Sequence, residues 1–203
     1  MDFKYEYFEK AALLEKSLKW KELLEHCTRW SEQEPDNFLP WSSIGLSYRH
    51  LEQPEEAVEA YEIGIGLAPE QPVQFFTVTF SAGPLWNGLG LAYSALNKVD
   101  DAIEAFTQAA RIDSHEAKAW ENLGVAYTHK GNAVKALDAF KRASFLNPAD
   151  TNVLKKIGLV YASIGQQDGV AVVHKMLLQH SASVASDFMK QATALLKDRQ
   201  NTK

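Results

Sequence analysis

The stretch WENLGVAY, residues 120–127, is a near copy of WNGLGLAY, residues 86–93, which lies 34 positions earlier. Looser copies stand at residues 41–48 (WSSIGLSY) and 154–161 (LKKIGLVY). Segments that recur with a period of about 20–50 residues fold as stacked supersecondary units, each packed on its neighbours. The period therefore predicts a repeat architecture and argues against a globule built around an enzyme pocket.

Each repeat contains two helical patterns. In residues 41–48 the large residues recur at i, i+3 and i+7, and in residues 57–64 the pattern is i, i+4 and i+7, so each segment presents one face of a helix. Small residues are needed where two helices approach closely, because a protein interior has no room for extra volume. The small residues expected at these approaches are Gly45, Gly90, Gly124, Gly158, Ala57, Ala102 and Ala136.

The turns between the two helices also repeat. Asn97, Gly131 and Gly165 occupy the same position in their repeats. Asn and Gly tolerate the left-handed conformation that ends many helices. Pro148 follows the second pattern of its repeat and cannot continue a helix, so it marks the end of that unit.

The combined pattern, W-x2-L-G-x2-Y followed by A-x3-F-x2-A and a closing proline, resembles the tetratricopeptide repeat (TPR) family. The resemblance implies an all-α, right-handed superhelical solenoid of helix-turn-helix pairs. It also implies that the first helix of each pair lines a concave groove. These residues are packing residues, so the pattern is specific for the fold and says much less about function.

The repeats are expected to form a single domain, 1–203, closed by an amphipathic capping helix with Ser186 or Asp187 near its N-cap. Both terminal repeats depart from the pattern, with Cys27 in the first and His174 in the last where the inner repeats have Tyr or Phe, and atypical ends are usual in repeat proteins. The expected segments are repeats 4–37, 38–71, 83–116, 117–150 and 151–184, an insertion at 72–82, and the capping helix at 186–199.

The insertion, PVQFFTVTFSA, interrupts the period. From Phe76 onward apolar and polar residues alternate, which favours a strand. Three arrangements are open: the segment fills a gap between two repeats, crosses the concave face, or pairs with a second copy of the chain. An exposed strand of this composition is prone to self-association. The residues that would mediate it are Phe75, Phe76, Val78 and Phe80.

Composition favours an ordinary soluble protein. The net charge is −5 and acidic and basic residues are mixed, whereas nucleic-acid binding usually needs a basic stripe. Residues 1–20 lack the apolar core of a secretory signal, and no stretch approaches the 18 apolar residues of a membrane span. A cytoplasmic location is therefore expected. The single cysteine, Cys27, is expected to be a buried, inert thiol.

No catalytic or metal-binding constellation stands out, so we expect a non-enzymatic protein without cofactors. No two of the six histidines have the i, i+3 or i+4 spacing that places two metal ligands on one helical face. The acidic pairs Glu55–Glu56 and Asp100–Asp101 open second helices, where carboxylates interact favourably with the helix dipole.

The resemblance implies which positions of each repeat face the groove: typically the second, fifth, sixth, ninth, twelfth and thirteenth. The ninth position is aliphatic in four successive repeats, so an apolar floor is expected, and lysines give a modest basic rim toward the C-terminal end. The groove residues predicted in this way are Leu46, Asn87, Leu91, Lys118, Asn122, Val125, Asn152, Lys155, Lys156 and Leu159.

An apolar groove with a polar rim suits a helix or an extended peptide, so an adaptor or scaffold that binds a segment of a partner protein is the expected function. Self-assembly through the ends or the insertion, giving a homo-oligomer, is one alternative. Another is a co-chaperone that binds the acidic tail of a heat-shock chaperone. Of the five residues of that family's clamp, only Asn122 and Lys156 have counterparts here, so the clamp is mostly absent.

Overall fold

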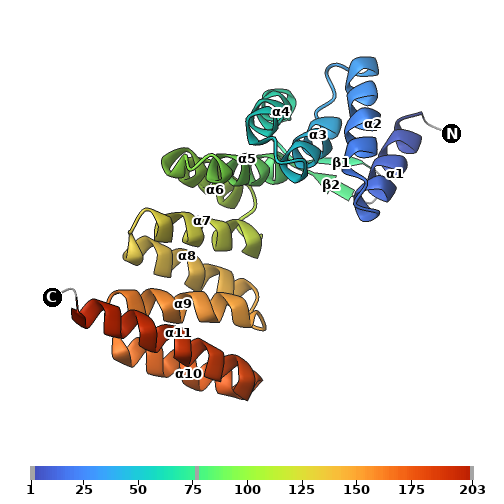
Figure 1. The fold of residues 1–203 in the computed structure, drawn as a ribbon. Helices are drawn as coiled ribbons and strands as arrows, with labels where there is room; N and C mark the ends of the chain where they lie inside the picture. The colour runs from blue at the N-terminus through green and yellow to red at the C-terminus, as the bar shows by residue number, and fades with distance from the viewer. Residues whose placement is uncertain (1–2, 76–77, 202–203) are drawn as a thin grey trace. The chain divides into compact units, whose positions relative to one another are not determined.

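The computed structural model describes residues 3–75 and 78–201. Within these ranges the chain forms eleven α-helices and one two-stranded antiparallel sheet (Figure 1). The helices belong to two compact units: unit 1 ends at Asp113, and unit 2 begins at Ser114. The predicted all-α class and its succession of helix pairs are confirmed. The grouping of all repeats in a single domain stays a prediction.

Unit 1 contains three helix pairs and the sheet. Successive helices pack on one another along the chain, and the first helices of the second and third pairs, α3 and α5, also contact each other. The elements of unit 1 are α1 (Phe3–Lys16), α2 (Trp20–Gln33), α3 (Leu39–His50), α4 (Pro54–Leu67), β1 (Val73–Phe75), β2 (Val78–Phe80), α5 (Gly83–Ala95) and α6 (Val99–Ile112).

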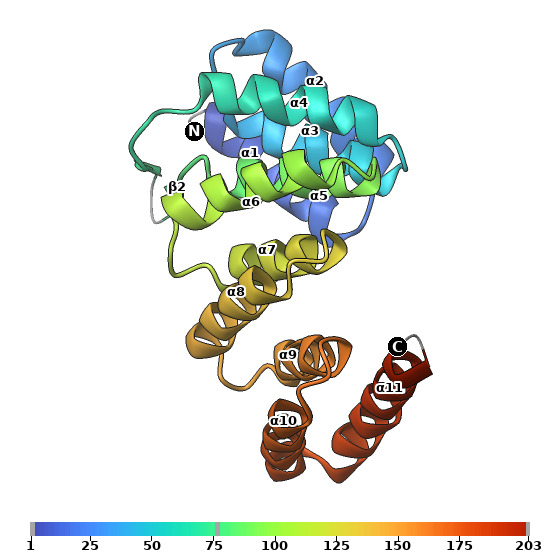
Figure 2. The same ribbon diagram turned by 90° about the vertical axis from the view of Figure 1, so that its left-hand side faces the viewer.

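Unit 2 contains two helix pairs and a final long helix (Figure 2). The final helix, α11, packs on both α9 and α10. The elements of unit 2 are α7 (Ala117–His129), α8 (Ala133–Leu146), α9 (Thr151–Ser163), α10 (Gln167–His180) and α11 (Ala182–Asn201).

Aromatic rings pack directly on the predicted small residues of the first helices. A Cβ added to these glycines would lie within 2.4–2.7 Å of a ring atom: Gly45 against Tyr61, Gly90 against Phe106, Gly124 against Phe140 and Gly158 against Phe188. Real Cβ atoms do not approach other atoms so closely. The absence of a side chain at these positions therefore allows each ring to contact the helix backbone, as the repeat pattern predicts.

The turn inside each pair is left-handed at the predicted position. Asn97, Gly131 and Gly165 have φ values of 58°, 76° and 79°. Leu18 and Glu52 adopt the same conformation in the first two pairs, with φ values of 54° and 60°. The turn geometry is thus common to all five pairs, even where the residue is one that rarely adopts a positive φ.

The capping helix starts earlier than predicted. It begins at Ala182, so Ser186 and Asp187 lie inside the helix and are not its N-cap. The backbone N–H of Val184 instead donates a hydrogen bond of 3.4 Å to Oγ of Ser181, which is the arrangement of a serine N-cap. Ser181 also follows the last residue of α10, so one residue separates the two helices.

The insertion forms a hairpin in place of the single strand that the alternation predicted. β1 pairs with β2 in antiparallel register, with Val73 opposite Phe80 and Gln74 opposite Thr79. Phe76 lies outside the described residues. The hairpin lies beside α3 and reaches α1 (Figure 1), where the Phe80 ring meets the Phe8 ring edge to face with 5.5 Å between centroids. The structure therefore places the described part of the insertion beside the first helices of unit 1. Which of the three arrangements considered from the sequence applies stays a prediction.

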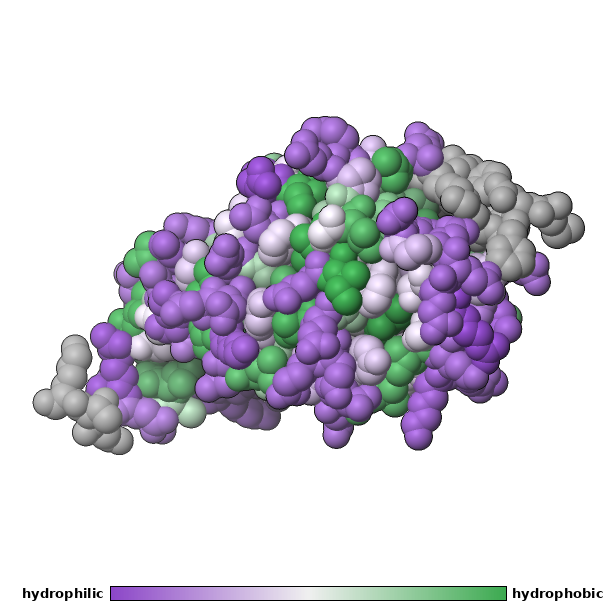
Figure 3. All heavy atoms as spheres, turned by 90° about the horizontal axis from the view of Figure 1, so that it is seen from above, coloured by the Kyte–Doolittle hydropathy of each residue, from purple (hydrophilic) through white to green (hydrophobic). Residues whose placement is uncertain are grey.

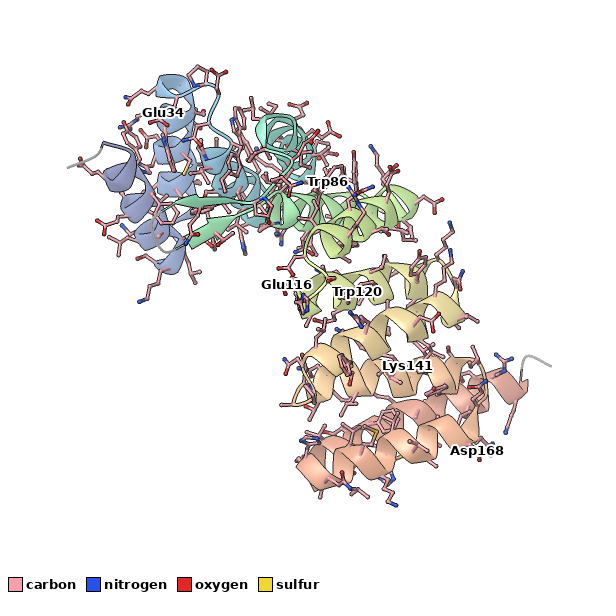
Figure 4. All side chains as sticks on the ribbon, turned by 180° about the vertical axis from the view of Figure 1, so that it is seen from behind. Glu34, Trp86, Glu116, Trp120, Lys141 and Asp168 are labelled. Atoms are coloured by element: carbon pink, nitrogen blue, oxygen red, sulfur yellow. The ribbon has the colours of Figure 1, made fainter. Side chains whose placement is uncertain are left out.

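The repeated tryptophans join the core only in part. Trp86 and Trp120 are partly buried and pack against the cores of units 1 and 2 respectively (Figure 4). The indole N–H of Trp120 donates a hydrogen bond of 3.0 Å to the carbonyl oxygen of Ser114, which fixes the chain just before α7. Cys27 is fully buried, as predicted, and burial raises the pKa of its thiol to about 12.

Candidate functional site

An apolar cavity of about 340 Å³ opens on unit 2. Its walls come from α7, α8, α9 and α11, and six of its residues occupy the repeat positions that are expected to face the groove. The lining residues are Val125, Thr128, His129, Phe140, Lys156, Leu159, Val160, Ser163 and Leu195. We refer to this feature as the unit 2 cavity. It combines an aliphatic and aromatic interior with a few polar groups, which is the usual composition of a ligand site.

A buried carboxylate lies beside this cavity. Glu121, on α7, has only 9% of its side chain exposed, and its two oxygens accept hydrogen bonds from two different lysines. Lys118 Nζ lies 2.7 Å from Oε2, and Lys156, on the next repeat, donates to Oε1. Lys156 also lines the cavity, so this Lys–Glu–Lys cluster borders the apolar interior of the cavity.

The cluster keeps Glu121 ionised. Burial by itself raises the pKa of this carboxyl, but the hydrogen bonds and positive charges of Lys118 and Lys156 outweigh burial and hold the pKa below its ordinary value of 4.5. Two ammonium groups around one carboxylate leave a net positive charge. Glu121 therefore partly neutralises two of the lysines predicted for the basic rim, Lys118 and Lys156.

This arrangement makes the stability of unit 2 depend on pH. A group whose pKa is lower in the folded state stabilises the fold above its unfolded pKa, and that contribution is lost as the pH falls through the folded-state pKa. We expect Glu121→Gln to be less stable than the wild type at pH 7, with a difference that shrinks steadily below pH 4.5. Urea unfolding of both proteins from pH 7 to pH 3 measures this difference.

The matched control is Glu22→Gln. Glu22 pairs with Lys19 at 2.9 Å, but both side chains are more than half exposed, and exposed ion pairs contribute little to stability. A pH-independent loss in Glu121→Gln, or an equal loss in the control, contradicts the assignment of a stabilising ion cluster at Glu121.

The predicted groove residues do not all meet in this site. Val125, Lys156 and Leu159 line the unit 2 cavity, and Lys118 joins it through Glu121. Asn122, on α7, is only 9% exposed, so its side chain lies in the protein interior and not on an open rim. Two others, Asn152 (exposed) and Lys155 (partly buried), lie on α9 outside the lining, and three are partly buried in unit 1, namely Leu46, Asn87 and Leu91.

Several residues of the site were not predicted. Thr128, His129 and Ser163 occupy the twelfth and thirteenth positions of their repeats, so the same positional rule could have found them. Glu121 occupies the fifth position, but only its burial beside Lys156 reveals its role. Leu195 comes from α11 and could not be found from the repeat, since the capping helix does not follow the repeat pattern.

Metal sites and membrane-spanning helices are not evident among the described residues. In the ranges that the structure describes, no group of three His, Cys, Asp or Glu residues could hold a metal ion. None of the described helices combines the length and the apolar character needed to cross a membrane. On the face shown in Figure 3, hydrophobic residues gather in small patches between hydrophilic ones.

Comparison with known proteins gives matches to repeat families. Two models described as tetratricopeptide repeat match this chain, one over residues 87–151 and the other over residues 40–71. Superkiller complex protein 3 of Mus musculus is 42% identical over 53 residues, which is 26% of this chain and 3% of that protein. The human protein is 40% identical over the same length. The chain thus matches about 3% of the length of these curated relatives.

Solved structures share the fold over most of the chain. MamA superposes with a TM-score of 0.68 at 18% identity, covering 99% of this chain and 98% of MamA. YrrB, described as a TPR protein with an unusual peptide-binding site, superposes with a TM-score of 0.69 at 18% identity, covering 91% of this chain and 90% of YrrB. At these identities the likeness concerns the fold alone.

Proposed function

The chain belongs to the tetratricopeptide-repeat family, and on that premise we propose that it is a non-enzymatic adaptor that binds a segment of a partner protein at the unit 2 cavity. The observation that carries the proposal is the cavity itself, where residues at groove positions of two successive repeats surround about 340 Å³ of mainly apolar space. YrrB, a protein of similar fold, has a peptide-binding site.

The cavity is suited to one or two apolar side chains of a peptide. Its volume is at the lower end of the range of about 300–1,000 Å³ that is usual for ligand pockets. Val125, Leu159 and Leu195 are aliphatic and come from three different helices, so an inserted side chain would be enclosed from three directions. Because the walls are packed helices, little ordering is needed on binding.

The Lys–Glu–Lys cluster would orient the bound segment. Lys118 is 62% exposed and Lys156 is 36% exposed, so both can contact a ligand while Glu121 holds them in place. The cluster disfavours the chaperone-tail alternative, because an acidic tail would compete with Glu121 for both ammonium groups. We therefore expect a segment with an apolar anchor and hydrogen-bond acceptors near it.

Peptide display tests this proposal. A random peptide library is selected against the wild type, and the recovered peptides are measured against Leu159→Glu by fluorescence anisotropy. Leu159→Glu puts a carboxylate on the apolar wall that a bound side chain would cover, and covering a charge with an apolar group is strongly unfavourable, so we expect the affinity to fall at least 100-fold. The melting temperature of each variant is measured alongside.

Val134→Glu is the matched control. Val134 is 72% exposed on α8 and does not line the cavity, so the same change should leave binding within twofold of the wild type. Equal affinity for the wild type and a folded Leu159→Glu protein sinks the proposal, and so does a failure of selection to yield any saturable peptide.

A further inference from the structure

Unit 1 carries a cavity of about 360 Å³ that is lined by residues of α4, α5 and α6. We refer to it as the Tyr93 cavity. Two partly buried aromatic side chains of α5, Trp86 and Tyr93, line it. Three exposed carboxylates also belong to the lining, Glu62 on α4 and both Asp101 and Glu104 on α6. The cavity therefore combines aromatic rings with negative charge, a composition that suits an organic cation.

The three carboxylates act on the same ring. The hydroxyl of Tyr93 donates a hydrogen bond of 2.7 Å to Oε1 of Glu62, which joins α5 to α4. Burial raises the pKa of Tyr93, and the hydrogen bond to Glu62 together with the charges of Glu62, Asp101 and Glu104 raises it further, to about 12. Among the residues that the structure describes, none of the three carboxylates forms an ion pair with a lysine or arginine.

The corresponding rings of unit 2 each lie beside a lysine. Tyr127 and Tyr161 occupy the same repeat position as Tyr93. Nζ of Lys135 lies 5.3 Å from the centroid of the Tyr127 ring, and Nζ of Lys141 lies 5.9 Å from that of the Tyr161 ring. An ammonium group within about 6 Å of a ring centroid is attracted by the ring electrons. At this repeat position the chain therefore uses its own lysine side chains as partners of the ring.

Carboxylates replace both of these lysines at Tyr93. Lys135 stands at the nineteenth position of its repeat, and Asp101 holds that position in the repeat of Tyr93. Lys141 stands at the twenty-fifth position, in the repeat before its ring, and Glu62 holds that position in the repeat before Tyr93. The places that supply an ammonium group in unit 2 thus supply acceptors for one in unit 1.

Tyr93 has one ammonium group of its own. Lys98, at the N-cap of α6, places Nζ 5.7 Å from the centroid of the Tyr93 ring. Lys98 is exposed and does not line the Tyr93 cavity, so it leaves the cavity open. One ammonium group beside three carboxylates leaves an excess of negative charge, which a cation from outside the chain would neutralise.

We propose that the Tyr93 cavity binds a lysine side chain of a partner protein, with the ammonium group among the three carboxylates and the methylene stem against the two rings. Carboxylates accept charge-assisted hydrogen bonds from an ammonium group, and aromatic faces attract the cation. We assign a protein lysine, and not a free amine, because a lysine side chain is what the chain itself places at the corresponding rings of unit 2. This inference does not depend on the proposed function of the unit 2 cavity.

Nuclear magnetic resonance of the full-length chain tests the proposal. The probe is a pentapeptide with blocked ends that has a central lysine between glycines, and the readout is the indole N–H signal of Trp86, identified with Trp86→Phe. We expect this signal to shift saturably with the lysine peptide. The same peptide with an acetylated lysine has the stem without the charge, so it should bind at least tenfold more weakly.

Two double variants separate the cavity from the general charge of the chain. Asp101→Asn with Glu104→Gln should weaken the lysine peptide at least tenfold, because it removes two of the three acceptors. Glu59→Gln with Asp138→Asn is the matched control. It removes the same charge from two exposed residues that do not line the cavity, so affinity should stay within twofold of the wild type.

Several results would overturn the proposal. They are an unchanged Trp86 signal in the presence of the lysine peptide, equal affinity for the acetylated peptide, or an equal loss of affinity in the two double variants. Tenfold tighter binding of n-butylammonium chloride, a free amine with the same stem, would overturn the assignment of the site to a protein lysine.

Discussion

Phe188→Ala is expected to lower the free energy of unfolding of unit 2 by about 3–5 kcal/mol, the range measured when a buried phenylalanine is truncated to alanine. Phe188 lies on α11 with no exposed surface, and it belongs to the core cluster that α8, α9, α10 and α11 share. Its ring lies within 2.4 Å of the place that a Cβ would take at Gly158. Truncation leaves a cavity there, because the glycine has no side chain that could fill it.

The effect is large because the capping helix supplies a core ring that the second helix of the last repeat lacks. In the two preceding repeats the ring that packs on the glycine comes from the second helix, as Phe106 on Gly90 and Phe140 on Gly124. The last repeat has His174 at that position, and the ring on Gly158 is supplied by α11 instead. We infer that α11 completes the core of the last repeat and does more than cover an apolar face.

Urea unfolding followed by helical circular dichroism measures the loss. Lys190→Ala is the matched control, because Lys190 lies on the same helix, is exposed, and forms only an exposed ion pair with Asp187 at 3.1 Å. Hydrogen exchange should also show that the amides of α9 lose protection in Phe188→Ala and keep it in the control. A loss below about 1 kcal/mol means that the last repeat is stable without this ring.

The sequence predicts the repeated part of this fold well because the period reports packing. Gly124 and Phe140 recur in other repeats as the same pair of residue types, so their contact could be inferred before any coordinates. Phe188 could not be assigned in this way. It belongs to a helix outside the period, and only the packed arrangement shows which glycine it contacts.

The residues of the candidate site likewise fall into those that the repeat positions predict and those that only the packing reveals. Val125 and Leu159 follow from the repeat positions, and both line the unit 2 cavity. Glu121 does not, since a glutamate on an amphipathic helix is usually solvated, and its burial depends on Lys156 from the next repeat.

The hairpin contact was likewise beyond the sequence. Alternating residues indicate a strand, but they do not identify the surface against which it packs. Here that surface includes Phe8, which belongs to the first helix of the chain.

Gly124→Val is expected to destabilise unit 2 by about 3 kcal/mol, at the upper end of the range for overpacking a core. A Cβ at this position would lie 2.6 Å from two atoms of the Phe140 ring. That ring is 1% exposed and is surrounded by the core of unit 2, so it cannot move aside without displacing its neighbours. Gly66→Val is the matched control, since Gly66 is also helical and no atom lies within 4 Å of its added Cβ.

The strain at Gly124 comes from one specific pair of residues, so it should be relieved by a smaller partner. We expect Gly124→Val combined with Phe140→Leu to be more stable than the sum of the two single losses by about 1 kcal/mol or more, as residues in contact show in double-mutant cycles. Additive losses in the double variant, measured by urea unfolding, contradict the assignment of this ring as the reason for the glycine.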